Sequence, residues 1–336
     1  MRRAALLVAV VGMPLLARLG AQPDSPIPDR VWFTPAPASA DMVRLFEAAD
    51  EWSRSRDRID VFKFYQQHTL AAHPVVGPNT FEALSRVGAF RKVGDWGKRL
   101  ALEAGAVKEF YCTADATGMT ESVKSTVTSL AAIEQAGGTV SYLAMDEPFL
   151  AGRSLTCGGP GPEPTADRLT TYITGVKRAY PQVRIGLIEP YPAFSVEELA
   201  AMLRLTRERG VPLAFLHVDV NLDAVNPRRH YVQRDMARLS VISAAEQVPF
   251  GVIVWGVNGD DAALYSADAL QLASAFGTGF AQWKRSPDHV IFQSWAESAG
   301  GQRAIPNNLP ESDPMSMTGI MERVLWLWGD VLVQRR

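Results

Sequence analysis

Carboxylic acids end three successive apolar stretches of this chain. Asp146 and Glu147 end the first stretch. Glu189 ends the second, and Asp219 ends the third. A carboxyl group can donate or accept a proton in a reaction, and two carboxyl groups on either side of a glycosidic bond can catalyse its cleavage. In a (β/α)₈ barrel the C-terminal ends of the strands carry the active site. The pattern therefore predicts catalytic acids at one end of such a barrel.

The number of strands between two acids decides which reaction they could share. An inverting pair of carboxyl groups stands about 6.5–9.5 Å apart, and a retaining pair about 5–5.5 Å apart. Neighbouring strands lie about 5 Å apart, so Glu147 and Asp219, two strands apart, suit the inverting distance. Glu147 and Glu189, on adjacent strands, suit either distance. We expect Glu147 to be the general acid, with Asp219 the first choice for the base and Glu189 the second.

Polar and aromatic side chains near the same strand ends could bind the substrate. Flat rings suit the C–H faces of sugars, although tryptophan in a strand also serves core packing. His217 lies two residues before Asp219 and so points the same way from its strand, but a histidine in an apolar strand also suits a hydrogen-bonded core position. The predicted substrate-binding residues are Asp146, His217, Trp255, Trp295, Gln293, Tyr65 and Tyr191.

Eight stretches rich in β-branched and aromatic residues could position these side chains. Most are near-continuous apolar runs, which is typical of strands covered on both faces. Helix-length segments separate most of them, and no glycine-rich phosphate turn follows the first, so a single-domain (β/α)₈ TIM barrel is favoured over a doubly wound open sheet. The predicted strands are Val31–Pro35, Val61–Gln66, Ala106–Tyr111, Val140–Met145, Val183–Ile188, Leu213–Val218, Gly251–Trp255 and Val290–Trp295.

Helix signals fall between these stretches. Ser195 with Glu198 three residues later forms a capping-box pattern, and Gly210 suits a helix C-terminus. Lys63 and Lys108 fall inside predicted strands, where a buried lysine needs a partner such as Glu109 or a substrate group. The predicted helices are Asp41–Arg54, Thr80–Ala104 with a break near Gly88, Thr120–Gln135, Ala166–Tyr180, Ser195–Arg209, Arg229–Glu246, Ala262–Phe276 and Met317–Val333.

The segment Asp146-Glu147-Pro148 resembles the Asn-Glu-Pro signature that follows the fourth strand in clan A glycoside hydrolases. The resemblance implies that Glu147 is the acid/base and that Asp146 contacts the sugar. It rests on this short motif and on the barrel pattern of the whole chain. Clan A places its nucleophilic glutamate at the end of the seventh strand. Here Val252–Asn258 contains no acid, and the first one after it is Asp260, so the retaining mechanism of that clan does not carry over directly.

The first residues have the pattern of a removable export signal. Arg2 and Arg3 precede the mostly apolar run Ala4–Ala17, and the small residues Gly20 and Ala21 follow it. The run is shorter than the roughly 20 residues of a membrane-spanning helix. A signal peptide over residues 1–21 is therefore favoured over a membrane anchor. The barrel would then occupy residues 22–336, in a protein exported to the periplasm or the extracellular space.

Composition limits the classes of partner. The 336-residue chain has 34 basic and 36 acidic residues, and loss of residues 1–21 would leave 31 basic residues against 36 acidic ones, a formal charge near −5. This balance lacks the basic surface that nucleic acids require. We expect a carbohydrate substrate, no cofactor and no membrane contact after signal cleavage. The oligomeric state, the sugar and its linkage are not predicted.

Cys112 and Cys157 are the two cysteines of the chain. In an exported protein they could form a disulfide bond between the end of the predicted third strand and the loop after the fourth. Two buried free thiols are the alternative. We favour the disulfide.

Two other functions remain open from the sequence. A metal-dependent sugar isomerase or epimerase could use Glu147, Glu189, His217 and Glu297, because such barrels hold a divalent metal with acids and a histidine. A barrel that binds glycan without cleaving it is the second alternative.

Overall fold

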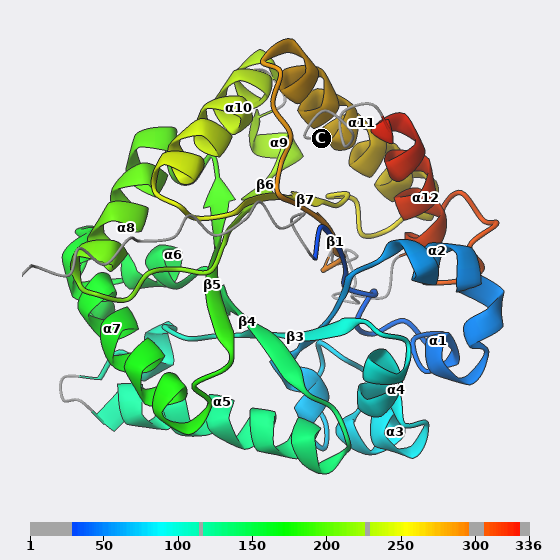
Figure 1. Ribbon diagram of the computed structural model, residues 1–336, viewed down its shortest axis with the longest axis horizontal. Coiled ribbons are helices and arrows are strands. Elements are labelled where there is room, and N and C mark those ends of the chain that lie inside the picture. The colour runs from blue at the N-terminus through cyan, green and yellow to red at the C-terminus, as the bar shows by residue number, and fades with distance from the viewer. Residues whose placement is uncertain (1–28, 114–116, 226–228, 296–305, 330–336) are drawn as a thin grey trace, which may run out of the picture.

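The structure is a computed structural model that describes residues 29–113, 117–225, 229–295 and 306–329. The predicted signal peptide and Glu297 lie outside these residues. Eight parallel strands form a closed barrel, in which each strand pairs with the next and β8 pairs with β1 (Figure 1). The predicted (β/α)₈ TIM barrel is therefore confirmed. The strands are β1 (Val31–Phe33), β2 (Val61–Tyr65), β3 (Arg99–Ala104), β4 (Val140–Asp146), β5 (Arg184–Tyr191), β6 (Leu216–Val220), β7 (Phe250–Val254) and β8 (His289–Phe292).

Helices surround the barrel on its outside (Figure 1). Ser195 and Glu198 form the predicted capping box at the start of α8, which satisfies backbone N–H groups of the first turn. Within the described ranges, no helix is long and apolar enough to cross a membrane. The helices are α1 (Arg44–Glu47), α2 (Ser53–Arg58), α3 (Phe81–Arg86), α4 (Ala89–Asp95), α5 (Thr117–Gln135), α6 (Pro148–Gly152), α7 (Pro162–Ala179), α8 (Val196–Glu208), α9 (Leu222–Val225), α10 (Arg229–Ala245), α11 (Ala262–Gln282) and α12 (Met317–Leu327).

The predicted third strand is wrong. Ala106–Tyr111 forms a loop and the 3₁₀ turn η3 (Glu109–Tyr111), while β3 lies within the predicted helix Thr80–Ala104. Gly88 and Gly97 both adopt positive φ angles, of 66° and 70°, which glycine reaches without steric cost. These two glycines separate α3, α4 and β3, so one long helix cannot form.

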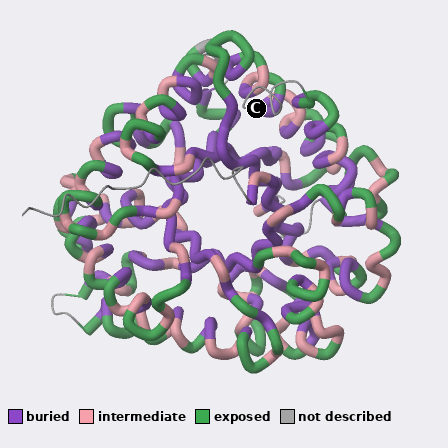
Figure 2. The backbone as a smooth tube through the Cα atoms, in the orientation of Figure 1, coloured by how far each residue is buried: buried purple, intermediate pink, exposed green. Residues whose placement is uncertain are grey.

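Buried side chains fill the interior of the barrel, and the strands form a buried ring inside the partly exposed helices (Figure 2). Two glycines leave room for large rings in this interior. A Cβ atom on Gly186 would lie 2.4 Å from the ring of Phe215, and one on Gly251 would lie 2.6 Å from the His217 ring. His217 and His289 pack together, with His217 Nε2 2.9 Å from His289 Nδ1. Aromatic rings therefore fill this part of the barrel interior.

A disulfide bond joins Cys112 to Cys157. Cys112 follows η3, in the loop after β3, and Cys157 ends the 3₁₀ turn η4 (Leu155–Cys157), in the loop after β4. The predicted disulfide is confirmed. It ties together two loops that leave neighbouring strands on the C-terminal side of the barrel.

Candidate active site

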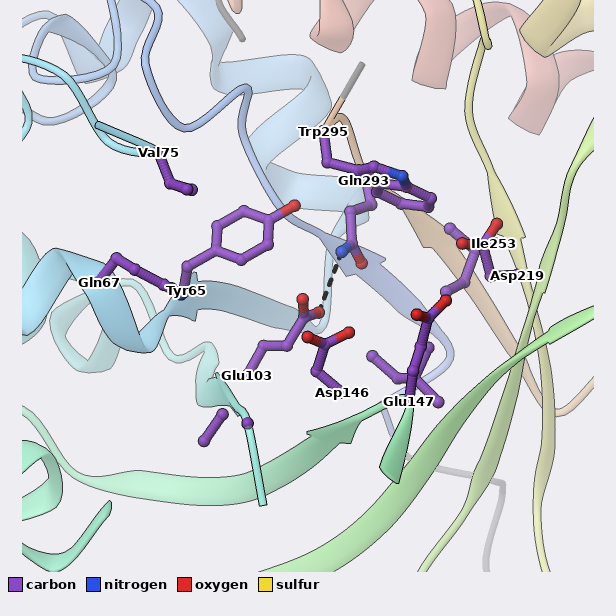
Figure 3. A pocket seen from close by; sticks show the side chains of 13 residues that line it. Tyr65, Gln67, Val75, Glu103, Asp146, Glu147, Asp219, Ile253, Gln293 and Trp295 are labelled. Atoms are coloured by element: carbon purple, nitrogen blue, oxygen red, sulfur yellow. Dashed lines mark hydrogen bonds between the residues drawn. The ribbon is translucent and has the colours of Figure 1, made fainter. Parts of the chain in front are cut away.

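A cavity of about 220 Å³ opens at the C-terminal ends of the strands (Figure 3). Its walls come from β2, β3, β4, β5, β6 and β7, from segments that follow β2, β3 and β4, and from the segment that follows β8. Four carboxylic acids are among its lining residues, and no lysine or arginine is among the described residues that line it. The lining residues are Tyr65, Gln67, Val75, Glu103, Ala104, Gly105, Asp146, Glu147, Ile188, Asp219, Ile253, Gln293 and Trp295.

Glu147 lies just after β4, in a backbone conformation that non-glycine residues seldom adopt. Its φ and ψ angles are 45° and 47°, and the left-handed conformation costs about 1–2 kcal/mol. Its N–H group donates to the carbonyl of Ile188, at 3.0 Å. Strain of this kind is concentrated at functional sites, where the surrounding structure holds it in place.

The environment of Glu147 favours the protonated acid. Burial, together with the neighbouring charges of Asp146 and Glu103, raises the pKa of Glu147 to about 7, while Lys108 opposes the shift. A carboxyl group with this pKa can donate a proton near neutral pH. The geometry therefore suits Glu147 to act as a general acid.

Asp219 lies near the end of β6, two strands from Glu147. Asp219 is 8% exposed, and its Oδ1 atom is buried without a hydrogen-bond partner among the described residues. Burial raises its pKa well above the usual range, and the charges of Glu147 and Asp146 add to this effect. A buried oxygen atom without a partner is costly, so a ligand or a proton is needed here.

Asp146 is held by a lysine from the neighbouring loop. Lys108 Nζ lies 2.7 Å from Asp146 Oδ2. Lys108 was predicted to lie within a strand, but it belongs to the loop that follows β3. The pair joins the loop after β3 to the end of β4.

Glu103 is the acid of the cavity that sequence reasoning missed. It lies near the end of β3, and its Oε2 atom accepts hydrogen bonds from Lys63 and from Gln293, the latter at 3.0 Å. Lys63 is fully buried, and its partner is Glu103 rather than Glu109. Burial raises the pKa of Glu103, and the ammonium group of Lys63 opposes this shift. Because the third strand was predicted at Ala106–Tyr111, Glu103 fell within the predicted helix Thr80–Ala104 and was not considered as a strand-end acid.

Glu189 does not line the cavity, although sequence reasoning made it the second choice for the base. It is fully buried, and its two carboxylate oxygens accept hydrogen bonds from the N–H groups of Phe149 and Leu150, at 2.7 and 3.3 Å. These two N–H groups belong to the first turn of α6, where no carbonyl group of the helix itself can accept their hydrogen bonds. The position of Glu189 suits it to hold this helix and not to meet a substrate.

Three of the predicted substrate-binding residues also do not line the cavity: His217, Tyr191 and Trp255. His217 lies deeper in the barrel, where it contacts His289. Successive residues of a strand rise about 3.3 Å, so residues that share a face with Asp219 still differ in depth. Tyr191 is buried, and its hydroxyl donates to Asp235 at 2.7 Å.

The aromatic residues divide between wall and support. Trp295 and Tyr65 line the cavity, and the hydroxyl of Tyr65 donates to the carbonyl of Ser294 at 3.1 Å. Trp255 is buried behind Trp295, with ring centroids 4.3 Å apart and an interplanar angle of 29°. Its Nε1 atom donates to the carbonyl of Val220. Trp255 therefore supports the wall, and Trp295 forms it.

The end of β7 and the possible metal ligands bear on the clan A resemblance and on the metal-dependent alternative. Ile253 is the β7 residue that lines the cavity, while Asp261 caps the start of α11. Among the described residues, no group of three or more histidine, cysteine or acidic side chains is arranged to hold a metal ion. Glu189 and His217, two of the ligands that the metal-dependent alternative needs, lie outside the cavity wall.

No protein-family model matches this chain, and no curated protein sequence matches it. Solved structures do match. A glucosidase from Croceicoccus marinus is 15% identical, with a TM-score of 0.53 over 89% of this chain and 67% of the glucosidase. Active domain 2 of a chitinase from Pyrococcus furiosus is 15% identical, with a TM-score of 0.53 over 90% of this chain and 97% of that domain.

A D-psicose 3-epimerase matches at a similar level. It is 10% identical, with a TM-score of 0.52 over 90% of this chain and 99% of the epimerase. At these identities, the matches show a shared barrel fold. The fold is common to glycosidases and to sugar epimerases.

Proposed function

We propose that the protein is a glycoside hydrolase in which Glu147 is the general acid and Asp219 is the general base. The observation that carries this proposal is that both carboxyl groups line one cavity, with the pKa of Glu147 raised to about 7. The resemblance of Asp146-Glu147-Pro148 to the clan A signature supports the role of Glu147. The fold shared with a glucosidase and a chitinase also supports the proposed glycoside hydrolase function.

The two carboxyl groups would divide the work of an inverting reaction. Glu147 donates its proton to the glycosidic oxygen as the bond from that oxygen to the anomeric carbon breaks. Asp219 accepts a proton from the water molecule that attacks the anomeric carbon from the opposite side. The strands that carry them are two apart, about 10 Å along the sheet, which leaves room for that water molecule.

Electrostatic coupling fits this division. Burial is the largest cause of the raised pKa of Asp219, and the charge of Glu147 adds to it. When Glu147 holds its proton, this repulsion disappears and the ionised form of Asp219 becomes more favourable. A proton shared by the two carboxyl groups would then leave one as the acid and the other as the base.

The size of the cavity limits what can enter it. A volume of about 220 Å³ is below the roughly 300–1,000 Å³ of sites that enclose drug-sized ligands. It suits one sugar unit of a longer chain.

The test is hydrolysis of a panel of pentasaccharides of glucose, xylose, mannose and N-acetylglucosamine, followed by release of reducing ends. Glu147→Gln and Asp219→Asn should each reduce kcat by about 10²–10⁴, the usual effect of losing a general acid or base. Glu147→Gln should retain more activity on dinitrophenyl glycosides, whose leaving group needs no protonation. Glu246→Gln is the matched control, because Glu246 forms an ion pair with Arg207 far from the cavity.

Each rival has its own expected outcome. Isomerisation or epimerisation of a free sugar that disappears on prolonged chelation would favour the metal-dependent isomerase or epimerase. Binding measured by calorimetry, without release of reducing ends from any glycan, would favour a glycan-binding barrel. Near-normal turnover in either variant would contradict the role assigned to that residue.

We also propose that the protein is exported to the periplasm or the extracellular space. The disulfide between Cys112 and Cys157 supports this, because disulfides are typical of oxidising compartments. The signal peptide over residues 1–21 remains a prediction. N-terminal sequencing of the mature protein should begin at Gln22, and a retained Met1 would contradict it.

A further inference from the structure

A buried ion pair forms part of the cavity floor. The side chain of Lys63 is fully buried inside the barrel, and its Nζ atom donates to Glu103 Oε2 and to Gln293 Oε1. Gln293 Nε2 also donates to Glu103 Oε2, at 3.0 Å. The three residues come from β2, from β3 and from the segment that follows β8. They form a closed network in which every member bonds to the other two.

Such a pair is a poor means of stabilising a fold. The loss of hydration of two buried charges offsets most of their attraction, and apolar residues of similar size are often equally stable or more so. The position of Lys63 and Glu103 therefore needs a reason other than stability. The position itself offers one, because Glu103 and Gln293 both line the cavity.

The network leaves one carboxylate oxygen of Glu103 available. Oε2 accepts both hydrogen bonds, whereas Oε1 accepts none among the described residues. Glu103 is 6% exposed, and its exposed part meets the cavity. Figure 3 shows Glu103 and Tyr65 on one side of the cavity, with Glu147 and Asp219 on the other. The cavity thus has a reacting side and a second side whose polar groups are fixed.

We propose that Glu103 accepts hydrogen bonds from hydroxyl groups of the sugar unit in the cavity, while Lys63 and Gln293 hold it in place. This inference rests on the proposed glycoside hydrolase function. A fixed, charged acceptor gives strong and directional hydrogen bonds. Glu103 is then a specificity-determining residue that binds the sugar on the side away from Glu147.

The charge of the cavity walls also limits the class of substrate. Four acids line the cavity, and the two lysines beside it already bind Glu103 and Asp146. Glu147 and Asp219 have no cationic partner among the described residues. A uronate or a sulfated sugar would meet uncompensated negative charge. The cavity therefore suits a sugar unit without a negative charge.

The experiment measures binding in the absence of turnover. Glu147→Gln protein is titrated by calorimetry with the neutral pentasaccharide panel and with a pentamer of galacturonic acid. Adding Glu103→Gln should raise the Kd of the bound neutral sugar about tenfold or more, as expected for losing a hydrogen bond to a charged group. Adding Glu246→Gln should leave the Kd unchanged. The galacturonate pentamer should not bind.

A second variant separates binding from folding. Lys63→Met combined with Glu103→Leu replaces the pair by apolar residues of similar size, and the melting temperature should be equal to the parent's or higher. The same variant with Glu147 intact should show a larger rise in KM than fall in kcat. A merely structural pair would lower the melting temperature and leave KM unchanged.

The outcomes distinguish this inference from the proposed function. If no sugar binds the Glu147→Gln parent, the carbohydrate function itself fails. If a neutral sugar binds the parent and Glu103→Gln equally well, the role of Glu103 is overturned, whatever the double variant does. Tight binding of the galacturonate pentamer would overturn the substrate class.

Discussion

Glu189 holds the backbone that follows Glu147. Its carboxylate accepts hydrogen bonds from Phe149 and Leu150, two and three residues after Glu147, and the N–H group of Glu147 itself donates to the carbonyl of Ile188. β5 therefore fixes the strained turn at the end of β4 from two directions. On the proposed mechanism, Glu189 would be a positioning residue that acts through Glu147.

Glu189→Gln should lower kcat while KM changes little. The amide can accept a hydrogen bond through one atom, so one N–H group of α6 loses its partner, which costs about 1–3 kcal/mol in a buried site. Kinetics and thermal unfolding are measured together. The alkaline limb of the pH profile should also move, because the environment of Glu147 changes. A variant with lower stability but the parent's kcat and pH profile would show that Glu189 serves the fold alone.

The value of kcat/KM should fall as the pH rises, with a midpoint near pH 7. Glu147 must be protonated to act as an acid, and its pKa is raised to about 7, so activity is present below this pH and is lost above it. The charged groups that act on Glu147 are Asp146, Glu103 and Lys108. Asp146→Asn removes a negative charge and should move the limb to lower pH. A limb that does not move would contradict the assignment of the titrating group.

Glu147→Gln should stabilise the folded protein at pH 8. The pKa of Glu147 is raised above that of a free glutamate, so the folded state prefers the protonated form, and stability falls as the pH rises from about 4.5 to about 7. An uncharged amide avoids this loss, which corresponds to about 1–3 kcal/mol for a largely buried group. At pH 4.5 the two proteins should unfold alike in a denaturant titration. Equal stability at both pH values would mean that the native environment does not penalise the charge.

Trp295→Ala should raise KM about threefold to tenfold, because the ring is part of the cavity wall and packs on a second ring. Trp255→Phe is the comparison. It removes the hydrogen bond to Val220 but keeps an aromatic support behind Trp295, so it should lower the melting temperature more than it raises KM. Michaelis constants and melting temperatures of both variants decide the matter. A larger KM effect for Trp255→Phe would reverse the two roles.

The order of strands could be predicted from the sequence because buried parallel strands are continuous apolar runs. The third strand could not, since Arg99–Ala104 continues from a helical pattern and carries the charged residues Arg99 and Glu103. The glycine at position 97 was the available signal, because its positive φ ends α4 before the strand begins. With that strand misplaced, Glu103 could not be recognised as a strand-end acid.

The candidate site was predicted in part for a related reason. Strand ends could be located, so Asp146, Glu147 and Asp219 were expected on one face, and all three line the cavity. The direction in which each side chain points, and its depth in the barrel, could not be predicted from the sequence. Glu189 ends an apolar run as Glu147 does, but its side chain faces α6. His217 shares a face with Asp219 and lies below the cavity.

The rings that pack inside the barrel have a consequence for how a reaction there would proceed over time. Trp32, Phe215, His217 and His289 contact one another beneath the cavity and are buried. These rings fill the interior of the barrel beneath the cavity, which opens at the C-terminal ends of the strands. Substrate and released sugar would then use the same opening, so a product that leaves slowly would block the next turnover and act as a competitive inhibitor.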